Sequence, residues 1–133
     1  MEIKDFDKEY CQKGPYHHSQ SGFKKMWLDR NYSMLTDGFK GKVLDIACGD
    51  GRIADFLKKG AVIDGFDVSA KAVEFARSKH LYRDLWISDI RDKTAYDKDK
   101  YDHYVCSLSL QYLTDDELEN HFRSMSSLIA SGA

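Results

Sequence analysis

The fold of this chain follows from Val43-Leu44-Asp45-Ile46-Ala47-Cys48-Gly49-Asp50-Gly51-Arg52, in which a mainly apolar run enters a Gly-x-Gly turn. Apolar residues then recur at helical spacing, at Ile53, Phe56 and Leu57. This order predicts a strand, a glycine turn and a helix. Glycine has no Cβ and accepts positive φ, so such a turn brings bare backbone close to a ligand. The helix would direct its free N–H groups and the positive end of its dipole at the same ligand.

A second apolar run, Ala61-Val62-Ile63-Asp64-Gly65-Phe66, ends at Asp67, about 18 residues beyond Gly49. A carboxylate at the tip of a second strand can accept hydrogen bonds from both hydroxyl groups of a ribose. Together the two features predict a site for an adenosine-containing cofactor. Taken alone, the glycines would fit an ordinary tight turn and Asp67 would fit a helix cap, although Ser69 already suits that role.

The residues around the turn distinguish between cofactors. A dinucleotide fingerprint requires Gly-x-Gly-x-x-Gly, and Ala54 stands at its third glycine position, where alanine is sometimes tolerated. Asp45 lies inside the strand, a few residues before the glycines. Its carboxylate would repel a pyrophosphate and would attract an ammonium group, directly or through water. The ammonium group of S-adenosylmethionine meets this requirement.

In these features the sequence resembles the class I S-adenosylmethionine-dependent methyltransferases. Their first motif is an acidic residue followed by a Gly-x-Gly turn, and it is matched by Asp45, Gly49 and Gly51. Their second motif is an acidic residue that ends strand two, matched by Asp67. The resemblance implies S-adenosylmethionine, or its product S-adenosylhomocysteine, as the cofactor.

The resemblance continues at the third and fourth strands. Residues 85–88 are similar to the family's third strand, after which an acidic residue accepts from the adenine amine and an apolar residue packs on the ring; Asp89 and Ile90 match them. Residues 101–108 are similar to the fourth strand, which passes under the methionine part. The implied cofactor-binding residues are Asp45, Ala47, Gly49, Gly51, Asp67, Val68, Asp89, Ile90 and Ser107.

The predicted fold class is α/β, a Rossmann-like parallel sheet with helices on both faces. Strands are expected at 42–47, 61–67, 84–88 and 102–107, helices at 51–59 and 69–80, and a last helix after the capping box Thr114-Asp115-Asp116-Glu117. The family order implies a sheet of about four strands, 3-2-1-4. Because the family normally has seven strands, in the order 3-2-1-4-5-7-6, the sheet is expected to be incomplete.

One domain is expected over residues 1–133, with an N-terminal lid or helical segment (1–40) and a Rossmann-like core (41–133). Residues 1–18 are polar and aromatic and contain the only proline, which suits a lid over the cofactor. The candidate lid residues are Tyr10, Tyr16, His17 and His18. The helix that follows is expected to bury an apolar stripe of Phe23, Met26, Trp27, Met34 and Leu35.

Composition argues against several kinds of protein. The net charge of −2 gives no electrostatic case for nucleic acid or for an anionic membrane. The three cysteines form no Cys-x-x-Cys pair, which favours a reducing cytoplasm over a disulfide scaffold or a metal site. The N-terminus lacks an apolar signal core, and no apolar run could span a bilayer. The sequence predicts a cytoplasmic protein with no metal and no nucleic-acid or membrane partner.

The resemblance implies methyl transfer to a small-molecule acceptor. Such a displacement requires chiefly that the reactants be aligned and water excluded, so no catalytic residue is assigned. The missing strands leave an alternative, a non-catalytic or half-methyltransferase subunit that binds cofactor or a partner chain. A third alternative is a fragment of a longer reading frame. Because strand four would have an unpaired edge, a homodimer contact or a partner chain is expected to cover it.

Overall fold

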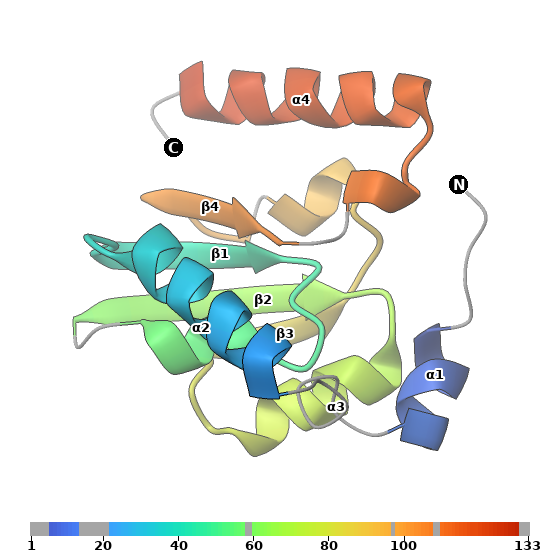
Figure 1. Ribbon diagram of the computed structural model, residues 1–133. Helices are drawn as coiled ribbons and strands as arrows, with labels where there is room; N and C mark the ends of the chain where they lie inside the picture. Colours follow the sequence, from blue (N-terminus) through green and yellow to red (C-terminus); the bar gives the residue numbers. More distant parts are fainter. Residues whose placement is uncertain (1–5, 14–21, 58–59, 97, 108–109, 131–133) are drawn as a thin grey trace.

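The structure, a computed structural model, describes residues 6–13, 22–57, 60–96, 98–107 and 110–130. This part of the chain forms a sheet of four parallel strands in the order β3-β2-β1-β4 (Figure 1). The strands are β1 (Gly41–Ile46), β2 (Ala61–Asp67), β3 (Asp84–Ile87) and β4 (His103–Cys106). The predicted strand order is confirmed.

The register brings the carboxyl ends of the strands to one edge of the sheet. Ile46 of β1 pairs with Phe66 of β2 on one side and with Cys106 of β4 on the other. Asp67 of β2 pairs with Ile87 of β3. The four segments that leave the strands therefore start side by side, at the right of Figure 1. Every predicted cofactor-binding residue lies at this edge, near the end of a strand or shortly beyond it.

Side chains alternate between the two faces of the sheet, and each face carries its own core. On one face, Val43 and Ile63 pack with Ile53 and Ala54 of the short helix η2 (Arg52–Phe56). The helix α2 (Gly22–Thr36) lies in front of the sheet in Figure 1, and α3 (Ala70–Ser78) lies below the sheet and contacts β2 and β3.

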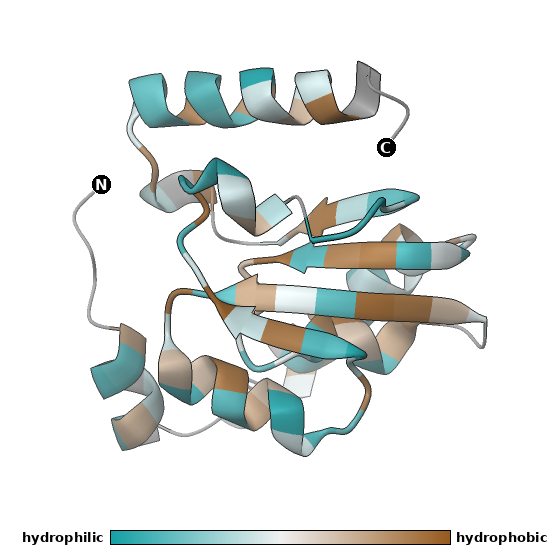
Figure 2. Ribbon diagram, turned by 180° about the vertical axis from the view of Figure 1, so that it is seen from behind, coloured by the Kyte–Doolittle hydropathy of each residue, from teal (hydrophilic) through white to brown (hydrophobic). Residues whose placement is uncertain are grey.

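The opposite face packs against the C-terminal helix. Its buried cluster consists of Leu44, Ile46, Phe66, Ala95, Tyr96 and Tyr101. Ala95 and Tyr96 of this cluster belong to the short helix η3 (Lys93–Tyr96), and Met125 and Leu128 of α4 (Asp115–Ala130) pack against the cluster. Figure 2, seen from behind, shows the hydrophobic segments of the strands on this side with α4 above them. The prediction of helices on both faces is confirmed.

The helix predicted at 51–59 is wrong in type and length. The described residues form η2, a 3₁₀ helix of five residues that follows Gly51 and ends where Leu57 becomes extended, with φ −72° and ψ 133°. The chain then turns through Gly60 (φ +102°) into β2. Because this helix is so short, its dipole adds little at its N-terminus.

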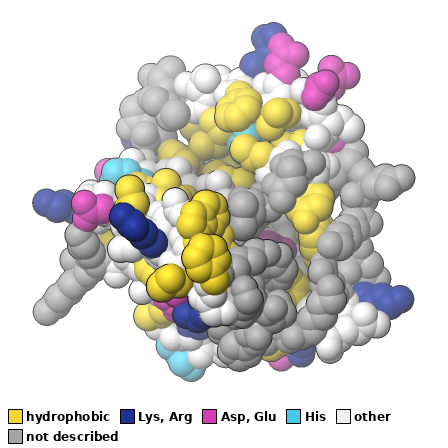
Figure 3. All heavy atoms as spheres, in the orientation of Figure 1, with side chains coloured by type: hydrophobic (Ala, Val, Ile, Leu, Met, Phe, Trp, Pro, Cys, Tyr) yellow, Lys and Arg dark blue, Asp and Glu magenta, His cyan; other side chains and the backbone are white. Residues whose placement is uncertain are grey.

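The predicted apolar stripe of α2 is also wrong. The inward side of α2 carries Leu28 and Thr36, which are buried, and Tyr32, which packs against the core around Val43; the three are spaced four residues apart. The Thr36 hydroxyl donates to the Tyr32 carbonyl at 2.9 Å and lies 3.2 Å from the Phe56 carbonyl, which ties α2 to η2. The predicted stripe of Phe23, Met26, Trp27, Met34 and Leu35 is exposed, from 48% for Leu35 to 76% for Phe23. Figure 3 shows hydrophobic side chains gathered over α2.

The ends of α3 and α4 are capped as expected. Ser69 accepts from the Ala72 N–H at 3.1 Å, and Thr114 and Glu117 form the reciprocal capping box. On α4, His121 is buried although it is polar. His121 is 8% exposed, and its Nδ1 lies 3.3 Å from the Tyr96 hydroxyl. Burial lowers the pKa of His121.

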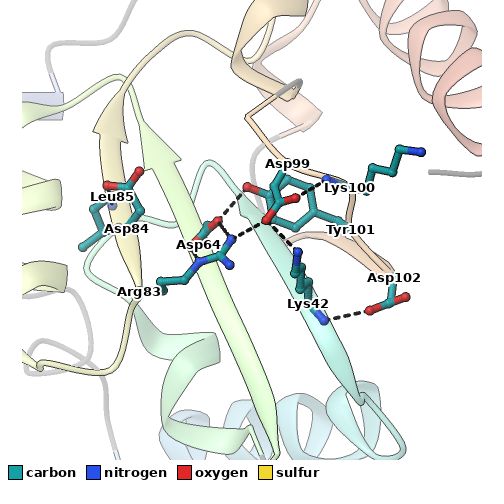
Figure 4. Close-up of polar contacts among 9 residues, drawn as sticks. All are labelled: Lys42, Asp64, Arg83, Asp84, Leu85, Asp99, Lys100, Tyr101 and Asp102. Atoms are coloured by element: carbon teal, nitrogen blue, oxygen red, sulfur yellow. Dashed lines mark hydrogen bonds and ion pairs between the residues drawn. The ribbon is translucent and has the colours of Figure 1, made fainter.

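A charged network joins the strands away from the predicted site (Figure 4). Arg83, just before β3, forms hydrogen bonds with the buried Asp64 of β2 and with Asp99. Lys42 of β1 also donates to Asp99, at 2.9 Å. The Tyr101 hydroxyl donates to Asp64 at 2.7 Å. This network links β1, β2, the start of β3 and the segment that leads into β4.

Candidate cofactor site

The turn after β1 is left-handed at three positions. The φ angles are 53° at Ala47, 56° at Gly49 and 89° at Gly51. The Cys48 N–H donates to the Phe66 carbonyl at 2.8 Å and so ties the turn to β2. A left-handed conformation costs an L-residue such as Ala47 roughly 1–2 kcal/mol. Strain of this kind is concentrated at functional sites, which agrees with the place that sequence reasoning gave the turn.

Asp67 joins the two predicted motifs directly. Its Oδ2 accepts from the Gly49 N–H at 2.9 Å, and its Oδ1 accepts from the Ser69 N–H at 2.9 Å. The side chain is 9% exposed, and burial raises its pKa. The carboxylate at the tip of β2 therefore fixes the glycine turn and the start of α3 at the same time.

Three buried carboxylates surround the turn. Asp45, Asp50 and Asp67 are 1%, 4% and 9% exposed. Burial, opposed by a hydrogen bond from Tyr82 and reinforced by the neighbouring charges of Asp67 and Asp50, raises the pKa of Asp45 to about 7. Carboxylates held this close create a negative potential, which favours a cationic ligand over a phosphate.

The predicted adenine-binding residues lie after β3. The Asp89 carboxylate accepts from Arg91, which also reaches Glu117 of α4 at 3.2 Å. The Arg91 guanidinium holds the pKa of Asp89 below its usual range. The Ile90 carbonyl accepts from the Tyr96 hydroxyl at 2.7 Å, and its side chain packs on the core. Both residues are partly buried.

The remaining predicted residues lie at the same edge. Val68 follows Asp67 and is 37% exposed, which leaves its side chain open to a ligand. Ser107 follows β4, and its hydroxyl lies 3.3 Å from the Tyr32 hydroxyl of α2. The structure thus brings Ala47, Val68 and Ser107 to neighbouring strand ends, although they are distant in sequence.

The N-terminal helix α1 (Phe6–Lys13) reaches the glycine turn. The Tyr10 hydroxyl lies 2.9 Å from the position that a Cβ on Gly49 would occupy. Burial raises the pKa of Tyr10, so this hydroxyl stays protonated at neutral pH. Asp7 accepts from the Ser69 hydroxyl and, at 3.0 Å, from the Lys71 N–H. Tyr10, a predicted lid residue, therefore lies at the turn.

Ring contacts hold α1 at both sides of the strand ends. Tyr10 packs on Phe75 of α3, with ring centroids 6.0 Å apart. Phe6 packs edge-on against Tyr112 of η4 (Leu110–Tyr112), with centroids 5.3 Å apart. The other predicted lid residues, Tyr16, His17 and His18, lie outside the described residues.

The geometry agrees with the comparisons to known proteins. A family model described as a methyltransferase domain matches residues 43–132. The chain belongs to this methyltransferase family. Ubiquinone biosynthesis O-methyltransferase of Vibrio vulnificus (strain YJ016) is 33% identical over 93 residues, which are 66% of this chain and 40% of that protein. The chain thus spans about two fifths of the length of the relatives it matches.

Solved methyltransferase structures have the same fold. A complex of DhpI with SAM and HEP superposes with a TM-score of 0.72 at 20% identity, over 92% of this chain and 57% of that one. Magnesium protoporphyrin IX methyltransferase (ChlM) from Synechocystis PCC 6803, with bound SAM, gives 0.68 at 19% identity, over 92% and 67%. The family resemblance inferred from the motifs is confirmed.

Sequence reasoning missed the residues that contact the glycine turn and the end of β1 from the connection between α3 and β3. Tyr82 and Lys79 lie between α3 and β3 and contact the turn through Asp45 and Gly51. Gly65 was a sequence signal for the Tyr82 contact, because a glycine inside a strand often marks the close approach of another group. Asp7 was also missed, since nothing local in the sequence relates α1 to α3.

Proposed function

We propose that this chain binds S-adenosylmethionine and S-adenosylhomocysteine across the carboxyl ends of β1, β2 and β3, and takes part in methyl transfer to a small-molecule acceptor. The observation that carries the proposal is the set of three buried carboxylates at a left-handed glycine turn. A ligand with positive charge and two neighbouring hydroxyl groups suits this set, whereas a pyrophosphate does not. Membership of a methyltransferase family supports the same ligand.

Each predicted residue has a role that its position allows. Each oxygen of Asp67 accepts one backbone N–H and has a second lone pair for a ribose hydroxyl. Gly49 leaves the backbone accessible to the methionine part, while Asp45 supplies negative charge behind the turn. The residues that line the adenine, ribose and methionine positions are Ala47, Gly51, Val68, Asp89, Ile90 and Ser107.

The cofactor, when bound, supplies an activated methyl group. The contribution of this chain is to orient the reactants and to exclude water, which in model reactions is worth roughly 7–11 kcal/mol. α1 is suited to the second task, because Asp7 and Tyr10 hold it against α3 and the glycine turn. We therefore assign α1 to a lid that closes over the site. No residue is assigned as a general base.

A second copy of the chain is the proposed partner. β4 is an edge strand of the described sheet, and an unpaired edge is a template for another chain. The exposed apolar side chains of α2, with Phe23 76% and Trp27 58% exposed, add a surface that water disfavours. Sedimentation at micromolar concentration tests this assembly. A stable monomer would contradict it.

The surroundings proposed for the protein are the reducing cytoplasm. Cys11, Cys48 and Cys106 are all free thiols, which suits that compartment. Among the described residues, no helix combines the length and hydropathy needed to cross a bilayer. The same residues offer no group of three or more His, Cys, Asp or Glu side chains placed to hold a metal ion. A small-molecule acceptor agrees with the net charge of −2, which does not favour nucleic acid.

Calorimetric titration with S-adenosylmethionine, S-adenosylhomocysteine and NAD tests the cofactor. Binding of the first two with no comparable affinity for NAD is the expected result, and equal affinity for NAD would refute the assignment. A methylation assay with the isolated chain then separates the enzyme from the alternative. Binding without turnover would identify a half-methyltransferase subunit that needs a partner chain, an alternative favoured by the short sheet.

A further inference from the structure

The connection between α3 and β3 inserts an aromatic ring beside the cofactor turn. The ring of Tyr82 lies between Gly51, in the turn after β1, and Gly65, in β2. A Cβ added to Gly51 would lie 3.0 Å from Tyr82 Cε2, and a Cβ added to Gly65 would lie 2.8 Å from Cε1. The distance at Gly65 is too short for a real side chain, and at Gly51 a side chain would have to displace the ring by a few tenths of an ångström. The two glycines thus leave the space that the ring fills.

The Tyr82 hydroxyl continues from the ring to the motif carboxylate. It donates to Asp45 Oδ2 at 2.7 Å. Asp45 is 1% exposed and pairs in register with Gly65, so the ring and the hydroxyl lie over one pair of strand residues. The contact couples Tyr82, in the connection that leads into β3, to the strand that leads into the cofactor turn.

Lys79, at the C-terminal end of α3, reaches the same turn from the other side of the connection. Its Nζ donates to the Gly51 carbonyl at 3.2 Å and to Asp55 at 2.8 Å. The connection therefore contacts three kinds of group in and beside the turn. These are the Gly51 carbonyl, the carboxylates of Asp45 and Asp55, and bare glycine backbone. Neither Tyr82 nor Lys79 itself belongs to the motifs that identify the cofactor site.

We propose that the α3–β3 connection holds the cofactor turn in its binding conformation, with Tyr82 as the positioning residue and Lys79 as its support. This inference rests on the proposed cofactor site. Glycines have many backbone conformations open to them, so a turn with Gly49 and Gly51 needs outside contacts to stay in one. The ring blocks movement of the turn toward β2, and the two hydrogen bonds hold its ends.

The charges around Asp45 make the role measurable. The groups that face it are Tyr82 and Lys79 from the connection, Asp67 from β2, and Cys48 and Asp50 from the turn. Burial raises the pKa of Asp45 to about 7, and the Tyr82 hydrogen bond acts in the opposite direction. Removal of that hydroxyl must therefore move the titration of Asp45 to higher pH.

The test is the affinity for S-adenosylmethionine between pH 6 and pH 8.5, measured by calorimetry on the full chain. In the wild type, affinity should rise with pH as Asp45 ionises near pH 7 and attracts the cation. Tyr82→Phe keeps the ring and should lower affinity roughly tenfold at pH 7, with its midpoint at higher pH, because a buried carboxylate loses one hydrogen bond. Asp45→Asn should abolish the pH dependence.

Tyr101→Phe is the matched control, because the Tyr101 hydroxyl also donates to a buried carboxylate, Asp64, at 2.7 Å and away from the turn (Figure 4). It should change the unfolding midpoint without changing affinity or its pH profile. Lys79→Met, at the end of α3, should also weaken binding of S-adenosylmethionine. If Tyr82→Phe does not fold, the affinity of Lys79→Met tests the inference. Wild-type affinity and pH profile in both Tyr82→Phe and Lys79→Met would overturn the inference. A wild type that binds no S-adenosylmethionine would instead refute the proposed function.

Discussion

Replacement of Gly49 by alanine separates the binding role of the turn from its structural role. Gly49 has φ +56°, so an alanine there costs roughly 1–2 kcal/mol of backbone strain. The new Cβ would lie 2.9 Å from the Tyr10 hydroxyl, and among the described residues no other atom outside its chain neighbours lies within 4 Å. That hydroxyl is the far end of a side chain on α1, so it can move. The expected loss of unfolding free energy is therefore the strain alone, about 1–2 kcal/mol.

Gly38→Ala is the control, because Gly38 has φ +84° and an added Cβ would meet no atom of the described part of the chain within 4 Å. Both variants should lose similar stability in urea titrations. In calorimetry with S-adenosylhomocysteine, Gly38→Ala should bind as the wild type does, whereas Gly49→Ala should lose most of its affinity because the methyl group occupies the ligand's approach. Equal affinity in the two variants would show that the turn is only structural. A much larger destabilisation of Gly49→Ala would show that the Tyr10 contact is rigid.

Three further predictions concern the carboxylates. Asp67→Asn presents an amide N–H₂ to one of two backbone donors, and should weaken cofactor binding by about 1–3 kcal/mol in calorimetry; unchanged affinity would exclude Asp67 from the site. Because burial raises the folded-state pKa of Asp45 to about 7, stability should fall as pH rises from about 4 to 7, and urea titrations of Asp45→Asn should lack this component. Asp7→Asn weakens the contact with Ser69, so hydrogen exchange in α1 should accelerate while exchange in the sheet stays unchanged. Exchange in α1 at the wild-type rate would count against a role for Asp7 in holding the lid.

The binding motifs could be read from the sequence because their physics is local. A strand of continuous apolar residues, a turn that requires positive φ and a carboxylate at a strand end each depend on a few neighbouring residues. The parallel register then brings the strand ends together, so the contact between Gly49 and Asp67 follows from two local patterns. The capping box at Thr114 was predictable for the same reason.

Other features depend on packing between distant elements. For α2, periodicity alone predicted the wrong buried side. The buried side of α2 is the one that carries Leu28 and Thr36, where the Thr36 hydroxyl bonds to the Phe56 carbonyl of η2, and Trp27 is left exposed. His121 is polar, yet it is buried because α4 crosses over Tyr96.

The sequence by itself determined the parallel sheet, its strand order and the carboxylates and glycines at one edge, because these follow from local pattern and from the family motifs. Only the tertiary structure decided what supports that edge. Tyr82 is an ordinary residue in the sequence, and its role arises because Gly51 and Gly65 leave room for its ring. Asp7 lies far from Ser69 in the chain, and the fold alone brings them together. Such contacts are set by shape across the sheet, which no spacing in one segment encodes.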